Sequence, residues 1–466
     1  MTETVSAAVP SEPTGLRLAR DRAFVSALVT TAVPVTLQAL MSTSRTMVDA
    51  VLVARLGTDE IAAIGYGSRV VFVVMLATMG MADGGAVIIA QFRGSGDAAR
   101  ARRATAVTTA VTVGIALVAL VVCLLWARPL VAVATEDPRV IDLGAQYVRA
   151  VIGMILPFAV ISSLAAALRC MARARVSASC ALVGIILHLT LAYGLVFGHW
   201  GLPSYGVRGA GWATLGSTCV EALLLVGYVY LSRNDMAFRV RDCVDGFRDG
   251  VSAKVRRVGV PVSVSSASWA LGILAYSILV GRTGTVELAV LSMVSPLESF
   301  AIAVFIGVST AASVMVGGSL GERRQERTWS LSKALLIWTA GIALGTCLVL
   351  TTAYFWLPVL YDGVGAATLS VARDTVLVLG AVFFFRAMNI TMQNGLLRAG
   401  GDTMFVLRVD LFTQWAVAVP LTALMTLVWD VPFPLVFLAI NAEEIARFLI
   451  SGSRVLRRRW MRVLID

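Results

Sequence analysis

Charged residues are scarce in this chain of 466 residues: Asp, Glu, Lys and Arg together make up 14% of it, whereas hydrophobic residues make up 58%. The mean hydropathy is +0.83. A soluble protein of this length needs far more polar surface than such a composition can supply. The low charge content therefore excludes a soluble protein and indicates a polytopic membrane protein.

Residues that usually carry enzyme chemistry are also few. The chain has two histidines, His188 and His199, and lacks HExxH, Walker A and GxSxG motifs with triad partners. Its six cysteines show neither paired nor metal-ligand spacing. We therefore expect no enzyme activity, no metal and no organic cofactor, and an ion gradient rather than ATP as the energy source.

Apolar stretches are abundant. About 20 apolar residues suffice to cross a hydrocarbon core of ~30 Å, and twelve such stretches recur along the chain. The residues Met1 to Pro13 are polar and lack an apolar core, so we expect no cleavable signal peptide. The predicted spans start near Phe24, Ile61, Ala104, Leu143, Val176, Val207, Val258, Glu287, Leu331, Asp374, Met404 and Val431.

The net charge of +11 follows membrane topology rather than a nucleic-acid surface. Of the 39 Lys and Arg residues, 28 fall on the side of the membrane that holds the N-terminus and eight on the opposite side. Positive charge accumulates in cytoplasmic loops. The distribution predicts a multi-pass protein of the cell membrane with both termini in the cytoplasm and no nucleic-acid partner.

The two halves of the chain repeat each other. The motif Val33 to Val35 recurs at Val260 to Val262, 227 residues later, and the surroundings of Gly57 and Gly94 recur at the same offset. Six spans return a chain to the side where it started, so the halves form a parallel repeat, an arrangement that many transporters use. The predicted parts are a tail at 1–23, an N-lobe at 24–231, a cytoplasmic linker at 232–257, a C-lobe at 258–451 and a basic tail at 452–466.

One apolar stretch, Val33 to Gly57, carries Arg45 and Asp49 one helical turn apart. A charged residue at a membrane centre costs about 2.5 to 3.5 kcal/mol even on lenient scales, so an intramembrane Asp is a functional candidate. Pro34 removes a backbone donor and bends or loosens the same helix. The alternative is a structural ion pair between Arg45 and Asp49, and both roles can coexist.

Three segments resemble the multidrug and toxic compound extrusion (MATE) family over nearly the whole chain. They are Pro34 with Asp49 and ARLGTDEIAAIG, the segment LAYGLVFGHWGLPSYGVRGAGWAT, and Asn389 with GLLRAGGDTMF. The last segment is similar to the prokaryotic DinF-like branch. The resemblance implies an all-α protein of 12 transmembrane helices in two pseudo-symmetric six-helix lobes forming a V. It also implies export of organic, often cationic, compounds in exchange for H⁺ or Na⁺.

The resemblance also implies roles for single residues. Asp49 matches the first-helix acidic residue that carries the coupling ion, and Pro34 matches a proline whose bend is linked to protonation. Thr214 matches a threonine near the N-lobe cation site.

Several positions depart from the family pattern. His188 and Ala192 stand where the family has oxygen-bearing side chains, Trp269 stands where one branch has a C-lobe carboxylate, and Arg45 is unusual beside Asp49. Na⁺ needs several oxygen ligands and is repelled by a guanidinium, whereas His titrates near neutrality. We therefore expect H⁺, less readily Na⁺, as the coupling ion, with His188 either sharing the proton of Asp49 or simply packed in the core.

Other residues inside the spans are candidates for a substrate cavity, although bonding or packing between helices is the commoner role of such residues. The cavity candidates are Asp83, Trp269, Tyr276, Glu298, Arg386, Asn389 and Gln393.

Asp49 has no acidic counterpart in the second half, because the offset of 227 leads to Tyr276. Coupling is therefore expected in the N-lobe alone.

The sequence thus predicts a monomeric efflux antiporter for small organic compounds, working by alternating access in the lipid bilayer. Two alternatives stay open: a lipid-linked oligosaccharide flippase of the related superfamily, and a membrane receptor or scaffold. The two-lobe repeat and the intramembrane Asp49 favour the antiporter over the receptor.

Overall fold

The computed structural model describes residues 15–465 except 54–57, 134, 136, 202, 233, 234 and 430, and the side chains of 46–62 also lie outside the description. Every regular element among the described residues is a helix. Asp49 therefore has a described backbone, within a helix, but its side chain belongs to the part that is not described.

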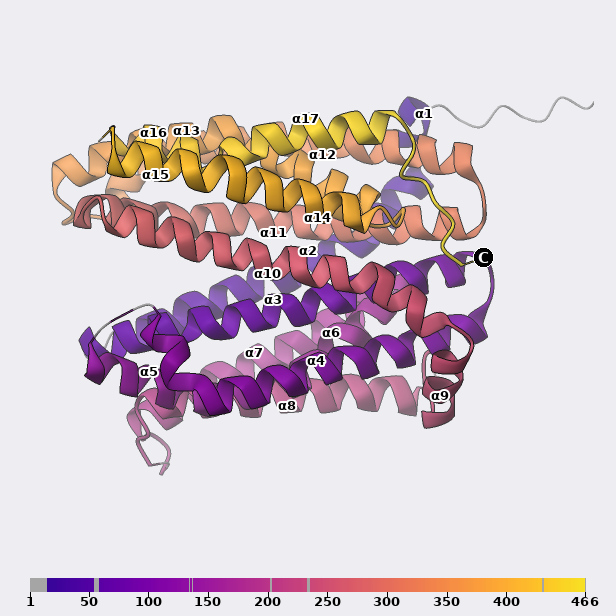
Figure 1. Cartoon of the computed structure of the whole chain (residues 1–466), viewed down its shortest axis with the longest axis horizontal. Coiled ribbons are helices and arrows are strands. Elements are labelled where there is room, and N and C mark those ends of the chain that lie inside the picture. Colours follow the sequence, from indigo (N-terminus) through magenta and orange to yellow (C-terminus); the bar gives the residue numbers. More distant parts are fainter. Residues whose placement is uncertain are drawn as a thin grey trace, which may run out of the picture.

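The N-terminal half holds α1 to α8 and the C-terminal half α10 to α17, joined by α9 (Figure 1). The bounds in the first half are α1 Gly15–Ala19, α2 Arg22–Val53, α3 Thr58–Gly94, α4 Ala98–Ala132, α5 Pro138–Val151, η1 Ile152–Met154, α6 Ile155–Cys170, α7 Ala174–Phe197 and α8 Val207–Leu231. Helix α9 spans Val240–Arg248. The second half has α10 Val251–Gly281, α11 Thr285–Gly321, α12 Gln325–Leu360, α13 Ala366–Ile390, η2 Thr391–Leu397, α14 Thr403–Leu411, η3 Phe412–Ala418, α15 Val419–Leu427, α16 Phe433–Ile440 and α17 Ala442–Leu456.

Twelve spans in two lobes follow from these helices, as predicted. Eleven are long and apolar enough to cross a membrane without interruption within the described part of the chain. The twelfth consists of α16 and α17, which meet at Asn441. At this break the Asn441 side chain donates a hydrogen bond to the carbonyl of Phe437 at 2.9 Å.

The predicted linker at 232–257 contains the start of a transmembrane helix. Helix α10 begins at Val251, whereas the sequence led us to expect a linker as far as 257. The start of this helix was not predicted because it contains three charged residues, Lys254, Arg256 and Arg257, which lower the hydropathy of the segment. Lys and Arg are nevertheless good helix formers outside the hydrocarbon.

The repeat predicted from the sequence reappears in the helices. Helices α3 and α11 start at Thr58 and Thr285 and end at Gly94 and Gly321, so both ends are 227 residues apart. The prolines Pro34 and Pro261, also 227 apart, lie inside α2 and α10.

Contacts between the lobes obey the same offset. The Thr36 hydroxyl of α2 donates to the carbonyl of Val304 in α11 at 3.4 Å. Its counterpart, Ser263 of α10, donates to the carbonyl of Ala77 in α3. The first helix of each lobe therefore packs on the second helix of the other lobe, and a pseudo-two-fold axis relates the two contacts.

The lobes meet most closely where α3 and α11 end. A Cβ added to Gly94 would lie 2.0 Å from the carbonyl oxygen of Gly318, and one added to Gly321 would lie 2.0 Å from that of Gln91. These two contacts are again equivalent by the offset of 227. Only glycine allows the two helix backbones to approach so closely.

The C-terminal tail closes the same end of the molecule. Gln91 of α3 is fully buried, donates to the carbonyls of Ala399 and Arg462 at 3.2 and 3.3 Å, and accepts from the backbone N–H of Leu464 at 2.8 Å. Trp460 is fully buried in an apolar cluster that joins C-lobe residues to α1 and α2, and Ile465 belongs to a cluster that joins α3 and α4 to the start of α10. The tail therefore contacts both lobes.

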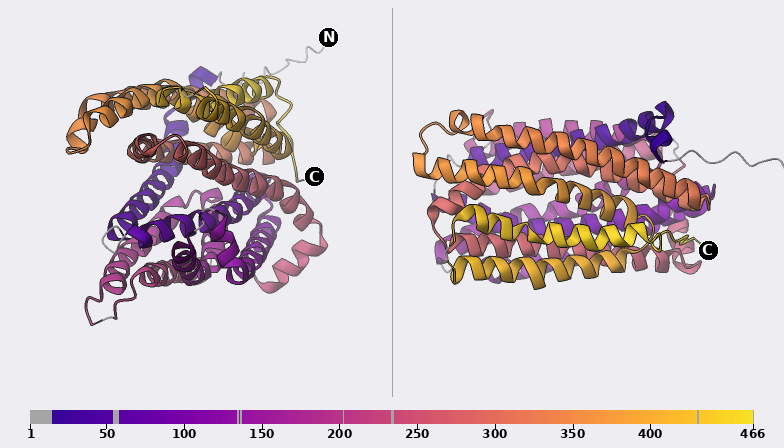
Figure 2. Two further views of the ribbon diagram at one scale, coloured as in Figure 1. Left: turned by 60° about the vertical axis from the view of Figure 1, so that its left-hand side comes forward. Right: turned by 90° about the horizontal axis from the view of Figure 1, so that it is seen from above.

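At the opposite end each lobe has its own core. One apolar cluster is built around Phe305 and Phe383 of the C-lobe, and another around Val148 and Ile155 of the N-lobe. Neither of these clusters contains buried residues from the other lobe. In the left view of Figure 2 most helices of the C-terminal half lie above those of the N-terminal half. In Figure 1 α9 and the C-terminus lie at the right-hand end, where the lobes meet.

Candidate functional site

Polar residues of the N-lobe gather between α7 and α8. His188 of α7 is fully buried, and its Nδ1 lies 3.5 Å from the hydroxyl oxygen of Ser217 in α8. Gly184, one turn before His188 on α7, faces Glu221, one turn after Ser217 on α8: a Cβ on this glycine would lie 2.9 Å from the Glu221 carboxylate. Thr214, one turn before Ser217, donates to the carbonyl of Ala210 at 3.0 Å.

Helix α2 supplies a positive charge to this region. It packs on α7. The guanidinium of Arg45 acts electrostatically on Glu221. Asp49 follows Arg45 by one helical turn on the same helix, with its side chain outside the described part. Two predicted coupling residues, Arg45 and His188, thus belong to neighbouring helices of one lobe.

Pro34 lies elsewhere on α2. It is buried two residues before Thr36, whose hydroxyl bonds to α11 of the other lobe. A change in the bend at Pro34 would therefore act on the contact between the lobes, while the other end of the helix carries Arg45 and Asp49. This placement is compatible with the conformational role that we expect for Pro34.

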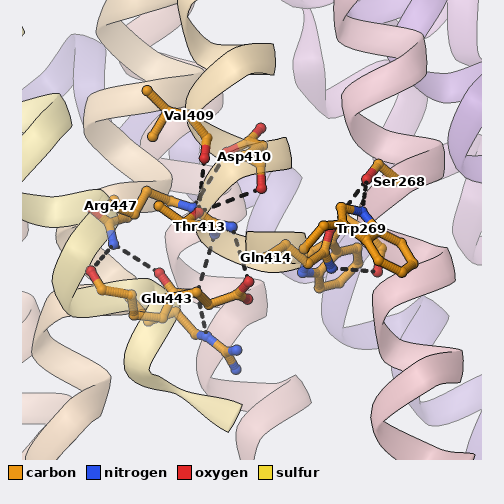
Figure 3. Close-up of polar contacts among 12 residues, drawn as sticks. Ser268, Trp269, Val409, Asp410, Thr413, Gln414, Glu443 and Arg447 are labelled. Carbon is orange, nitrogen blue, oxygen red and sulfur yellow. Dashed lines mark hydrogen bonds and ion pairs between the residues drawn. The ribbon is translucent and has the colours of Figure 1, made fainter. Parts of the chain in front are cut away.

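The C-lobe contains a dense group of charges, which we call the C-lobe ion cluster: Glu298, Arg386, Arg398, Asp410, Glu443, Glu444 and Arg447. Arg447 of α17 pairs with three of its carboxylates, and Figure 3 shows it with two of them, Asp410 and Glu443. Its guanidinium nitrogens are 3.3 Å from Asp410, 3.4 Å from Glu443 and 3.4 Å from Glu444. All four side chains are buried.

Arg386 of α13 links the cluster to α11. It pairs with Glu298, and its Nε lies 3.0 Å from Glu444. Asn389, one turn after Arg386, donates to the side chain of Glu444 at 2.8 Å. Tyr276 of α10 donates to Glu443 at 3.3 Å.

Arg398 joins the cluster from the end of η2. Its Nη2 lies 3.0 Å from the hydroxyl oxygen of Ser265 and 3.6 Å from Asp410, and Ser265 in turn donates to Asp410. Four carboxylates therefore face three guanidinium groups, and the bonds tie α10, α11, α13, α14 and α17 together. Charges removed from water need such partners.

Most of the predicted cavity residues contribute to these helix-to-helix bonds. Tyr276, Glu298, Arg386 and Asn389 belong to the ion cluster or bond to it, and Gln393 donates to Ser451 of α17 at 3.2 Å. Such bonding was the alternative considered for them. A direct role in substrate binding stays a prediction.

The other two predicted cavity residues lie near the boundary between the lobes. Asp83 of α3 pairs with Arg169 at 3.1 Å, its side chain is 39% exposed, and Arg398 of the C-lobe acts on it electrostatically. The ring of Trp269 lies 6.4 Å from that of Phe72 in α3, and the backbone carbonyl of Trp269 accepts from Gln414 at 3.4 Å (Figure 3).

Sequence reasoning missed four buried or half-buried carboxylates: Glu221, Asp410, Glu443 and Glu444. A signal for them was present. Each lies inside an apolar stretch, and Glu443 precedes Arg447 by four residues, the spacing of an ion pair on one helix face. No group of three or more His, Cys, Asp or Glu residues in the described chain is arranged to hold a metal ion.

Comparisons with known proteins agree with this architecture. The sequence profile of the family described as MatE matches residues 34–194 and 261–424. The matched segments start 227 residues apart and cover both halves of the chain.

One relative and two solved structures illustrate the likeness. The chain is 27% identical over 428 residues to the probable multidrug resistance protein NorM of Rhizobium meliloti (strain 1021), covering 89% of this chain and 88% of that protein. The eukaryotic MATE transporter AtDTX14 has the same fold with a TM-score of 0.84 at 15% identity, covering 97% of this chain and 98% of that one. A MOP superfamily transporter from Pyrococcus furiosus gives a TM-score of 0.83 at 18% identity, covering 96% and 99%.

Proposed function

The chain belongs to the MatE family of membrane transporters, and we propose that it exports small organic cations across the cell membrane in exchange for protons. The match to both lobes and the likeness to a probable multidrug resistance protein support efflux. We further propose that proton coupling runs through Asp49, Arg45 and His188.

In this proposal the end that carries α9 and both termini faces the cytoplasm. The excess of Lys and Arg on that side supports this orientation. The lobes pack tightly there, through Gly94, Gly321 and the tail at Gln91, and keep separate cores at the other end. The conformation described here is then closed to the cytoplasm and opens outward.

The main support for proton coupling is the packing of α2 on α7. It brings the helix of Arg45 and Asp49 to the helix of His188. A carboxylate next to a guanidinium keeps its proton only when the surroundings disfavour charge, so small movements of α2 can change its protonation. Protonation of Asp49 from the outside would release Arg45, alter the bend at Pro34 and weaken binding of a cationic substrate.

The surroundings of His188 support H⁺ over Na⁺. A Na⁺ site needs several oxygen ligands without a nearby cation, whereas here α7 offers an imidazole and α2 a guanidinium. The hydroxyl of Ser217 lies 3.5 Å from His188, and that of Thr214 is already bonded to a backbone carbonyl. The described residues of this region therefore suit proton transfer better than coordination of Na⁺.

The test uses the purified chain in proteoliposomes. Transport of a fluorescent organic cation is measured under an imposed pH gradient or an imposed Na⁺ gradient, for the wild type and for Asp49→Asn. We expect the pH gradient to drive transport, the Na⁺ gradient to have no effect, and Asp49→Asn to abolish the response. Full proton-driven transport by Asp49→Asn would overturn the assignment of Asp49, and Na⁺-driven transport would overturn proton coupling.

A further inference from the structure

Glu221 is a carboxylate inside the membrane-spanning helix α8 that the coupling scheme has not used. Its residue is half-buried, and among the described residues it makes no hydrogen bond or ion pair. An ionisable residue at such a position is costly, and it usually marks an ion or substrate path. The carboxylates of the C-lobe ion cluster differ, because each of them has an arginine partner.

The neighbouring helix makes room for this carboxylate. Gly184 of α7 faces it, and a Cβ at that position would lie 2.9 Å from Glu221 Oε2 and 3.2 Å from its Cβ. A side chain other than hydrogen at 184 would therefore displace the carboxylate. One turn away, the same two helices bring His188 and Ser217 within 3.5 Å.

Among the described side chains, the groups near Glu221 come from three helices. Helix α7 contributes His188 and the thiol of Cys180, on which Glu221 acts electrostatically, and α2 contributes Arg45. Asp49 follows Arg45 by one turn on α2, with its side chain outside the described part. Helix α6 contributes apolar side chains such as Leu164 to its contact with α8.

The remaining neighbours of α8 lie further away. The short helix η1, which has no charged residue, touches α8 at Leu215, six residues and about 9 Å from Glu221. Helix α5 touches it at Gly211, ten residues and therefore about 15 Å along the helix from Glu221. Arg173 reaches α8 only at Tyr228, seven residues and about 10 Å beyond Glu221. Arg45 is therefore the positive charge that the described surroundings supply.

From this geometry we infer that Glu221 is a second proton-binding carboxylate of the N-lobe, which shares Arg45 with Asp49. Two carboxylates that share one guanidinium keep an uncompensated negative charge in a medium of low dielectric constant. A proton can neutralise it, and so can a monovalent organic cation. Each excludes the other, and this exclusion is what an antiporter requires. The inference rests on the proton coupling proposed above and adds the group that makes proton and substrate compete.

The test measures binding of tetraphenylphosphonium, a monovalent organic cation, to the purified protein in nanodiscs at pH values from about 5 to 8. In the wild type, binding should weaken as the pH falls, because protons occupy the carboxylates. Glu221→Gln should bind the probe about tenfold more weakly at the alkaline end and lose most of the pH dependence, because one of two negative charges is gone. Glu221→Asp should restore part of both.

Two control variants distinguish a loss of proton binding at Glu221 from a general structural effect. Glu322→Gln removes a carboxylate that is 38% exposed and pairs with Arg324 and Arg327, and it should bind like the wild type. Gly184→Ala keeps every charge but displaces the Glu221 carboxylate, and it should shift the pH midpoint. Thermal unfolding of each variant reports whether it is folded.

The outcomes distinguish this inference from the proposed function. If Glu221→Gln binds the probe with the affinity and pH dependence of the wild type, Glu221 is not a proton site, whatever the result for Asp49. If Glu221→Gln is folded but weak at all pH values with an unchanged midpoint, its role is in packing, and the inference is wrong. If a pH gradient does not drive transport by the wild type in proteoliposomes, the proposed proton coupling is itself wrong, independently of Glu221.

Discussion

Arg447 shows how single residues hold the C-lobe together. Its guanidinium lies within 3.4 Å of Asp410, Glu443 and Glu444, and all of these side chains are buried. A buried ion pair adds little net stability over an apolar core, but removal of one partner leaves charges without compensation. The cluster therefore stabilises the lobe only as a whole.

We predict that Arg447→Ala lowers the free energy of unfolding by about 3 to 5 kcal/mol, because it leaves four carboxylates facing two guanidinium groups. The double variant Arg447→Ala with Glu444→Gln should recover part of this loss, since it restores the original charge balance. Thermal unfolding in detergent measures both. Arg457→Ala, at an exposed position, is the control; an Arg447→Ala variant as stable as this control would show that the cluster contributes nothing.

The sequence identified costly residues more readily than their partners. Arg45 with Asp49, and Glu298 with Arg386, stand out because charge is rare within apolar stretches. That Glu298 and Arg386 bond to each other, and that Arg398 reaches Asp410, depends on how α11, α13, η2 and α14 pack. Such contacts between distant segments leave no local pattern.

At the scale of elements, length and apolar content predicted most of the molecule, because a span must cover the hydrocarbon thickness. Eleven of the predicted spans are single stretches of helix in the described chain. The twelfth is divided at Asn441 into α16 and α17, and α17 carries Glu443, Glu444 and Arg447. Helix α9 was missed because it is a short, charged helix outside the membrane.

Helix α9 is held to α4 by Asp242. The backbone N–H of Arg239 donates to its carboxylate at 2.8 Å, and the Nε of Arg102 donates at 3.0 Å. Burial raises the pKa of Asp242, but the hydrogen bonds from Arg239 and Arg102 outweigh it, so the pKa lies below the ordinary value of 3.8.

A lowered pKa means that this carboxylate stabilises α9 above the ordinary pKa and loses that effect as the pH falls through the lowered one. We predict that hydrogen exchange of the α9 amides, corrected for its intrinsic pH dependence, accelerates below about pH 4. Asp242→Asn should exchange faster at neutral pH and lose this acid response. Asp235→Asn, at an exposed position 69% accessible, should behave like the wild type; an equal effect of both variants would contradict the assignment.

At the scale of the whole molecule, the pseudo-two-fold axis and the glycines near it explain how the lobes close one end. The contacts of Gly94 with Gly318 and of Gly321 with Gln91 are equivalent, and the tail adds hydrogen bonds to Gln91. The repeat was readable from the sequence, since the offset of 227 marks both lobes. The tail contact was not, because a basic terminal segment usually indicates solvent exposure.

We predict that Gly94→Ala and Gly321→Ala each open this end, because a Cβ there would lie 2.0 Å from a backbone oxygen of the opposite helix. Spin labels at Ser95 and Glu322 should report longer distances in both variants than in the wild type. Gly318→Ala is a matched control on α11, since a Cβ there meets no atom within 4 Å. Unchanged distances in Gly94→Ala and Gly321→Ala would show that close helix approach does not hold the lobes together.

The measurement that tests the central claim most directly is simultaneous recording of proton flux and organic-cation flux in proteoliposomes. In the wild type, a cation gradient should drive protons across the membrane in the direction opposite to the cation. Asp49→Asn should abolish this exchange. Cation flux without proton movement in the wild type, or undiminished exchange in Asp49→Asn, would contradict this account.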